Sequence, residues 1–296
     1  KIVRETIYTA VLTHEVGHSL GLMHNFGGSD DAINYHDQYW KIRDDGNVGP
    51  RLNDPITEEE KNAKLYDYAY SSIMDYAGRY TIDGQGLGKY DKAALMYGYA
   101  QKVQVFNELG GMTNQAMKEW FERDGEILLL YNTGPQAVHY TTFYNNMKDK
   151  LYDAGNRAWV DVTALSDDFS TAEVDGKTLS RVPYIYCSHS RYNLGDSCLT
   201  RDFGADSMER MSNILDELNT WYIQRSFPRG IVGWSNASYV RSYYGRIYSR
   251  LKKWNDIYGL YNDLLPTFYT PEQVKTFLTD PVGGWGDKTW AVQNAF

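Results

Sequence analysis

The sequence predicts a mainly α-helical protein with two regions, residues 1–100 and residues 101–296. A length of 296 residues suggests two domains at roughly 150 residues each, and 42% hydrophobic side chains can fill cores of that size. Apolar residues recur at steps of three and four along residues 4–20 and again in two stripes beyond residue 206. Because this spacing is typical of helices that bury one face, we expect helices at both ends of the chain.

The composition excludes several kinds of partner. Lys and Arg number 30 against 38 Asp and Glu, a formal net charge of −8, so the broad basic surface of a nucleic-acid-binding protein is missing. No stretch approaches the roughly 18 apolar residues of a membrane-spanning helix. Aromatic residues make up 15% of the chain, which suits rigid packing or a binding surface.

The first helix, expected from Arg4 to Leu20, carries the strongest chemical signal. His14 and His18 lie one turn apart on one face, about 6 Å along the axis, so both imidazoles can approach one ion of the size of zinc. Glu15 follows the first histidine and lies near the same site.

His24 is the third expected ligand, although on a continuous helix it would lie about 15 Å beyond His14. Gly21 resolves this, because a residue without a side chain can adopt a left-handed conformation that ends the helix and turns the chain back. The spacing therefore predicts a helix end at Gly21. By residue frequency, the full pattern arises by chance in about one chain in 10⁵.

A single histidine on an apolar helix face is usually a core residue hydrogen-bonded to a carbonyl, and only the three together favour a metal site. His36, His139 and His189 have no partner spacing of this kind. We expect them to be ordinary surface or core histidines.

The run His14-Glu15-Val16-Gly17-His18-Ser19-Leu20-Gly21-Leu22-Met23-His24-Asn25 resembles the long zinc signature of the metzincin clan of metallopeptidases. Ser71-Ser72-Ile73-Met74-Asp75-Tyr76 resembles the methionine turn of that clan, and residues 87–99 resemble the helix that closes its catalytic domains. From the zinc helix to Tyr99, the similarity is greatest to large bacterial metzincin-type zinc-dependent metalloproteases of uncharacterised substrate.

The resemblance implies a secreted zinc endopeptidase with peptide or protein substrates, in which Met74 underlies the three imidazoles. Tyr76 stands where astacins and serralysins have a tyrosine that binds zinc or steadies the oxyanion; plain core packing is the alternative for this residue. Asp91 would cap or anchor the closing helix. The chain would thus hold the C-terminal part of a metzincin-like catalytic domain, followed by a helical region.

Metzincin catalytic domains begin with a twisted sheet before the zinc helix, whereas thirteen residues precede His14 here. We therefore expect an upstream, sheet-containing segment of the parent protein to complete the substrate rim. We also expect an extracytoplasmic location, whether periplasmic, cell-surface or secreted.

The residues favour an enzyme over a scaffold. Three neutral imidazoles leave zinc a fourth position for water, whose pKa falls to about 7. Glu15 is suited to take the proton of that water as general base and to pass it to the departing amine. The alternative is a non-catalytic binding or scaffold module stabilised by zinc, in which a fourth protein ligand would replace the water.

Residues 25–55 are rich in Gly, Asp and Asn, which predicts a long loop near the cleft. Residues 44–47 favour a solvated turn over a calcium loop, because the spacing of calcium ligands is not met. Thr57 begins a capping box that predicts a helix to about Tyr70.

We expect helices over residues 113–123 and 135–151, and irregular structure over residues 152–205. Cys187 and Cys198 favour a disulfide in an exported protein, worth roughly 3 kcal/mol. Two free thiols, or a second metal site that uses His189 and Asp196, are the alternatives.

Beyond residue 206, two apolar stripes predict an antiparallel helix pair, with Ser235 capping the second helix and a last short helix beginning at Thr270. The first stripe is Met208, Met211, Leu215, Leu218 and Tyr222, and the second is Val240, Tyr244, Ile247, Leu251, Trp254, Tyr258, Tyr261 and Leu265. We expect the second stripe to be a core seam rather than a sugar-binding face.

Overall fold

The computed structural model describes residues 2–43, 56–76, 83–107, 157–169, 171–182, 184–190, 198–201, 203–205, 207–227, 230, 232–279 and 286–295. The helices expected over residues 113–123 and 135–151, the turn at residues 44–47, His139 and Asp196 lie outside these ranges.

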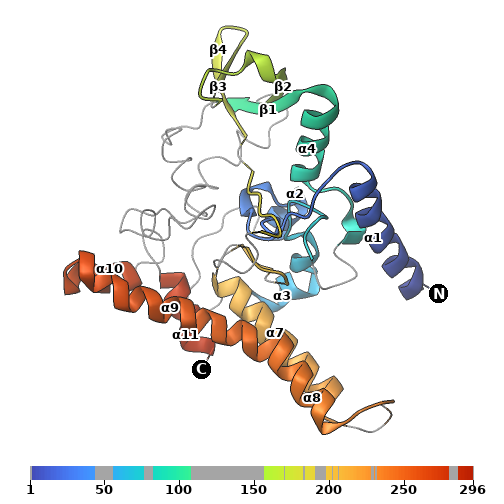
Figure 1. Cartoon of the computed structure of the whole chain (residues 1–296), viewed down its shortest axis with the longest axis vertical. Coiled ribbons are helices and arrows are strands. Elements are labelled where there is room, and N and C mark those ends of the chain that lie inside the picture. The colour runs from blue at the N-terminus through green and yellow to red at the C-terminus, as the bar shows by residue number, and fades with distance from the viewer. Residues whose placement is uncertain are drawn as a thin grey trace.

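The described chain is mainly helical, which confirms the predicted fold class (Figure 1). Its α-helices are α1 (Ile2–Ser19), α2 (Asp37–Ile42), α3 (Glu58–Asn62), α4 (Lys89–Ala100), α7 (Ser207–Arg225), α8 (Asn236–Tyr243), α9 (Ser249–Phe268), α10 (Pro271–Thr279) and α11 (Gly286–Ala295). Shorter helical turns are η1 (Ala32–Asn34), η3 (Leu65–Tyr68), η4 (Asp83–Gln85), η7 (Val162–Ala164) and the π-helical η8 (Tyr244–Tyr248). Within the described residues, none of the helices combines the length and the apolar character needed to cross a bilayer.

Helix α1 ends where its sequence predicts. Gly21 has a φ of +88°, and its amide donates to the His18 carbonyl at 2.9 Å while the Leu22 amide donates to the Gly17 carbonyl at 3.0 Å. These two bonds are those of a Schellman cap, in which a left-handed glycine closes the last turn and reverses the chain. The cap therefore brings the segment after residue 22 back beside the helix.

The prediction of a long loop over residues 25–55 is confirmed for residues 25–31, which form no helix or strand, but it is wrong for the described residues from Ala32 onward. Residues 25–32 are buried, and η1 and α2 follow them. Tyr35, Tyr39 and Trp40 join the main hydrophobic core together with Met74. Asp and Asn side chains of this segment make buried hydrogen bonds, such as that of the Asn34 amide to the Asp31 carboxylate at 2.7 Å.

The capping box at Thr57 is confirmed, since the Thr57 hydroxyl accepts from the Glu60 amide and the Glu60 carboxylate accepts from the Thr57 amide. The helix is shorter than predicted. Lys64 adopts a left-handed conformation with a φ of 60°, which ends α3 and leads into η3.

The prediction of irregular structure over residues 152–205 is wrong for residues 157–181, which contain three strands, and it is confirmed for the described residues from 184 to 205. Strands β1 (Lys102–Asn107), β2 (Arg157–Asp161), β3 (Thr171–Val174) and β4 (Lys177–Arg181) form an antiparallel sheet in the order β2-β1-β4-β3. Asp175 and Gly176, with φ of 52° and 73°, make the two-residue turn between β3 and β4. An Asp-Gly pair between two short polar-apolar runs is a hairpin signal.

The antiparallel helix pair is confirmed. The first half of α7 packs against α9 through Met211 and Ile214, which share a hydrophobic cluster with Leu251 and Trp254. The other end of α7 meets α8, where Trp221 lies 4.5 Å from Tyr239 between ring centroids. The α10 prediction also holds, since Thr270 and Gln273 cap each other.

The second stripe is a core seam only in part. Ile247, Leu251, Trp254 and Leu265 are buried, whereas Val240 and Tyr244 are exposed. On the first stripe, Tyr222 is exposed as well. These exposed positions lie toward the end of the pair that projects away from the rest of the molecule, where no further element covers them in the described part of the chain (Figure 1).

A buried polar cluster joins α7 to the N-terminal region. Arg43 pairs with Glu209 at 2.8 Å and with Glu60 at 3.3 Å, and all three side chains are buried. Tyr66 donates its hydroxyl to the Glu209 carbonyl at 3.0 Å. This cluster fixes the start of the helix pair relative to the segment that carries the histidines.

Candidate metal centre

The three histidines predicted to bind a metal converge on one point. Nε2 of His24 lies 3.2 Å from Nε2 of His14 and 3.1 Å from Nε2 of His18, and one nitrogen from each ring falls within 4.8 Å of the others. Ligands about 2.0 Å from a tetrahedral zinc ion lie about 3.3 Å from one another. The donor set and its spacing therefore fit zinc.

Each ring is oriented by a contact at its other nitrogen. Nδ1 of His14 lies 2.7 Å from the Ile73 carbonyl, and Nδ1 of His18 lies 2.9 Å from the Leu22 carbonyl. A proton on each Nδ1 leaves the Nε2 lone pair free, the tautomer that a metal ligand requires.

The electrostatic environment keeps His24 neutral. Burial and the neighbouring His18, His14 and His189 rings lower the pKa of His24 to about 4, while Glu15 acts in the opposite direction. An imidazole must be neutral to bind a metal, so at neutral pH His24 is in its binding form.

Met74 packs beneath the histidine-bearing turn of α1. Its side chain is fully buried, and a Cβ atom at Gly17 would meet the Met74 sulfur at 2.6 Å. The Met74 carbonyl accepts from the Asn25 amide at 3.1 Å. The methionine turn thus contacts both the helix and the segment after the third histidine, and Gly17 is needed for this close approach.

Asp91 both caps α4 and anchors the methionine turn. Its buried carboxylate accepts from the Gly88 amide at 2.8 Å, the Ile73 amide at 2.9 Å and the Ser72 hydroxyl at 2.7 Å. The two roles given as alternatives for Asp91 are therefore both filled.

Tyr76 and Glu15 lie on the rim of the cluster. The Tyr76 ring is 44% exposed and its centroid lies 4.6 Å from that of His24 and 6.0 Å from that of His14. Tyr76 is therefore not a core residue. Glu15 is exposed on α1, close enough to His24 to influence its pKa.

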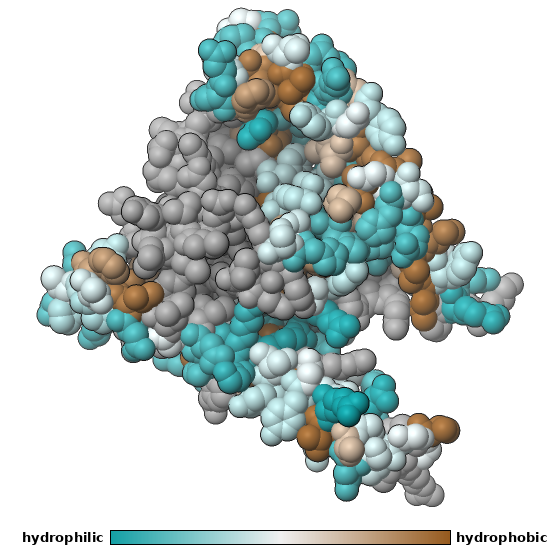
Figure 2. Space-filling model, viewed as in Figure 1, coloured by the Kyte–Doolittle hydropathy of each residue, from teal (hydrophilic) through white to brown (hydrophobic). Residues whose placement is uncertain are grey.

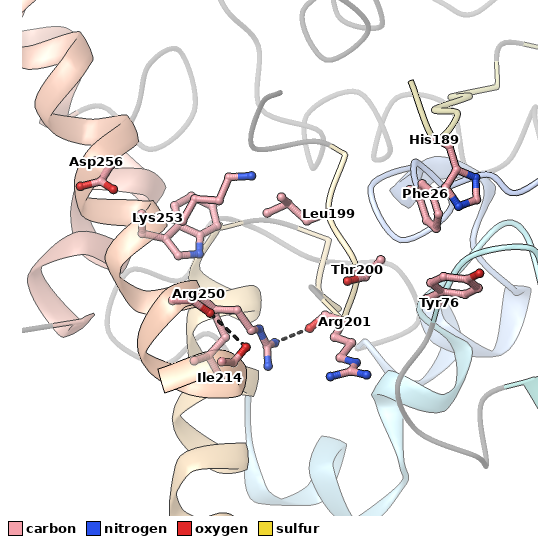
Figure 3. A pocket seen from close by; sticks show the side chains of 13 residues that line it. Phe26, Tyr76, His189, Leu199, Thr200, Arg201, Ile214, Arg250, Lys253 and Asp256 are labelled. Carbon is pink, nitrogen blue, oxygen red and sulfur yellow. Dashed lines mark hydrogen bonds between the residues drawn. The ribbon is translucent and has the colours of Figure 1, made fainter. Parts of the chain in front are cut away.

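An open cavity of about 700 Å³ adjoins the histidine cluster. Phe26, Tyr76 and His189 line one side, and residues of α9, among them Arg250 and Lys253, line the other (Figure 3). The helix pair therefore forms one wall of a cleft whose opposite wall borders the histidines.

The structure brings to the site two residues for which the sequence predicts no role there: His189, which was expected to be an ordinary histidine, and Asn25. His189 lies beside His24, with 3.3 Å between their Nδ1 atoms, and Asn25 hydrogen-bonds the segment before His189. Cys187 and Cys198 are joined by a disulfide, with Cα atoms 5.9 Å apart. The sequence offered one signal for a role of His189, its position two residues after Cys187, because a disulfide can hold the segment around it in a fixed place.

A family model described as Met-zincin matches residues 3–42, the segment that contains all three clustered histidines. No curated protein and no solved structure matches the chain. The family match and the converging imidazoles together support a metzincin-type family and a metal-binding role for this part of the chain.

Proposed function

We propose that the chain carries the zinc centre of an endopeptidase that hydrolyses peptide bonds. The convergence of three imidazole Nε2 atoms carries this proposal. In the described part of the chain, no fourth His, Cys, Asp or Glu completes the group. Three protein ligands are typical of catalytic zinc sites, whereas structural zinc has four, so the enzyme is favoured over the zinc-stabilised scaffold.

His14, His18 and His24 would hold the ion. Bound zinc would supply a Lewis acid that polarises the scissile carbonyl and lowers the pKa of water to about 7. The carbonyls of Ile73 and Leu22 fix the orientation of two of the rings, so that part of the site is organised before any ligand arrives.

Glu15 would act as the general base. Its carboxylate would accept the proton of the attacking water and then deliver it to the departing amine. Tyr76 would donate its hydroxyl to the oxyanion of the tetrahedral intermediate, which would lower the barrier by about 2 to 4 kcal/mol. The half-exposed position of Tyr76 beside His24 supports this role over core packing.

The cleft between α9 and the side chains of Phe26, Tyr76 and His189, which lie beside the three histidines, would receive the peptide or protein substrate. Its volume of about 700 Å³ has room for several side chains. The disulfide between Cys187 and Cys198 supports an extracytoplasmic location, because such bonds persist in oxidising compartments.

The exposed side of α1 supports the expected upstream partner. Hydrophobic residues gather over α1 at the right of Figure 2. The large exposed apolar or aromatic side chains of this helix and the turn after it are Tyr8, Val11, Leu12, Val16, Leu20 and Met23. We propose that the upstream segment of the parent protein covers this face, in which case amide hydrogen exchange along α1 will be slower in the parent than in this chain.

The test is peptide-library cleavage by the zinc-loaded parent protein and two variants. Glu15→Gln should keep zinc but lower hydrolysis by several orders of magnitude, because the base is lost while the ligands remain. Glu5→Gln is the matched control, since Glu5 lies on the same helix nearly three turns away and the variant should hydrolyse peptides like the wild type.

Near-full turnover by Glu15→Gln would refute the base assignment. A zinc-loaded parent that cleaves no peptide would contradict the endopeptidase proposal as a whole.

A further inference from the structure

We propose that His189 is a positioning residue of the metal centre, whose ring accepts the hydrogen bond that orients His24. This inference rests on the proposed metal site at the three histidines. Its basis is the contact between the two Nδ1 atoms, which are 3.3 Å apart and come from residues separated by 165 positions.

The tautomer that His24 needs for metal binding determines which of the two rings donates in this hydrogen bond. Nε2 of His24 faces the other two Nε2 atoms, so metal binding requires a lone pair there and places the proton on Nδ1. That proton points at Nδ1 of His189, which accepts it when its own proton is on Nε2. His189 thus does for His24 what the carbonyls of Ile73 and Leu22 do for His14 and His18.

The same geometry indicates that His189 is not itself a metal ligand. It contacts the nitrogen of His24 that is turned away from the converging Nε2 atoms, and it does not belong to the metal-ligand group formed by the described residues. His189 therefore acts on the site through His24.

Asn25 holds the segment that carries His189. The Asn25 side-chain amide donates to the Ile185 carbonyl at 3.0 Å, and its oxygen accepts from the Cys187 amide at 2.8 Å. The Phe26 amide also donates to the Cys187 carbonyl at 2.8 Å. Since Asn25 directly follows His24, these bonds tie the segment of His189 to the residue next to the third ligand.

Packing restricts the segment further. Phe26 lies in a buried cluster with the disulfide of Cys187 and Cys198, and the His189 ring meets the Phe26 ring edge to face with 4.8 Å between centroids. A Cβ atom on Gly27 would meet the Ile185 side chain at 2.6 Å, so the segments that contain these two residues approach each other too closely for any residue but glycine at position 27. His189 is exposed, yet the segment directly before it is held by hydrogen bonds and by packing.

Removal of His189 leaves the three ligands in place and takes away one orienting bond. Of the three groups that face an Nδ1 atom, His189 alone is a side chain, and so it alone can be deleted by substitution. Loss of such an outer partner typically lowers metal affinity 10- to 100-fold.

The experiment measures zinc affinity by chelator competition, together with the visible spectrum of the cobalt-substituted chain. His189→Ala should weaken zinc binding 10- to 100-fold and alter the cobalt spectrum, while His189→Gln, whose amide oxygen can accept from His24, should recover part of the affinity. Ser190→Ala is the control on the same segment and should match the wild type in both measurements.

Wild-type affinity and spectrum in His189→Ala would overturn the inference. Equal weakening by the Ala and Gln variants with an unchanged cobalt spectrum would also contradict it, because packing alone would then be the cause. His14→Ala separates the two proposals: if it leaves zinc affinity intact, the metal site itself is wrong, and if it abolishes binding while His189→Ala binds zinc with wild-type affinity, only the role of His189 fails.

Discussion

The histidine region and the C-terminal helix pair are held together in different ways. Around the histidines, buried polar groups such as Asp91 and Asn25 make directional hydrogen bonds to the main chain. In the helix pair, α7 and α9 meet through apolar side chains, among them Met211, Ile214 and Leu251. Directional bonds fix positions of individual atoms, whereas apolar packing tolerates exchanges of similar volume. A metal site needs the fixed atomic positions that directional hydrogen bonds provide, whereas apolar packing is sufficient for the wall of a cleft.

The largest expected difference between the two regions concerns Asp91 and Met211. Asp91→Ala should lower the free energy of unfolding by at least about 3 kcal/mol, because it leaves the buried donors of Ser72, Ile73 and Gly88 without their acceptor. Met211→Leu keeps the volume of a buried side chain and should lower it by less than about 1.5 kcal/mol. Urea denaturation of both variants checks this, and equal losses would contradict the comparison.

The next effect is a pH dependence that belongs to the histidine region. Burial raises the pKa of Asp31 to about 7 in the folded chain, although Asn34 donates to its carboxylate at 2.7 Å. Protonation therefore favours the folded state: this stabilisation is complete below about pH 4 and is lost as the pH rises through about 7. Asp31→Asn removes the titration and retains an acceptor for Asn34.

Between pH 5 and pH 8, the wild type should lose on the order of 2 kcal/mol of stability relative to Asp31→Asn. Asp256→Asn alters an exposed carboxylate of α9 and should show the pH dependence of the wild type. Unfolding free energies at the two pH values measure the difference. A constant gap between wild type and Asp31→Asn would show that Asp31 does not titrate in this range.

The smallest effect compares two glycines in helices. Gly17→Ala should lower stability by about 1 to 2 kcal/mol, since the new methyl group meets the Met74 sulfur and this outweighs the gain in helix propensity. Gly259→Ala in α9 meets no described atom within 4 Å and should be neutral or slightly stabilising. Thermal melts of the two variants give the comparison, which fails if Gly259→Ala is the more harmful change.

Local signals made the histidine region predictable. The His14 and His18 spacing, the helix end at Gly21 and the cap at Thr57 each depend on residues a few positions apart, and the structure contains the cluster, the helix end and the cap. The same holds for the antiparallel pair, whose apolar spacing is set within each helix.

Contacts between segments far apart in the sequence were not predicted. The pairing of β1 with β2 joins Lys102 to Asp161, and short strands of mixed polarity carry little periodicity of their own. The place of His189 depends on a contact with His24 across most of the chain. Such contacts arise only when the chain has folded, so composition and spacing do not reveal them.

X-ray absorption spectroscopy of the zinc-loaded chain tests the central claim most directly. The account predicts one zinc per chain, with three imidazole nitrogens and one oxygen at about 2.0 to 2.1 Å. The His14→Ala variant is expected to bind no zinc in the same measurement. A sulfur ligand, a fourth protein nitrogen or a chain that retains no zinc would contradict the account.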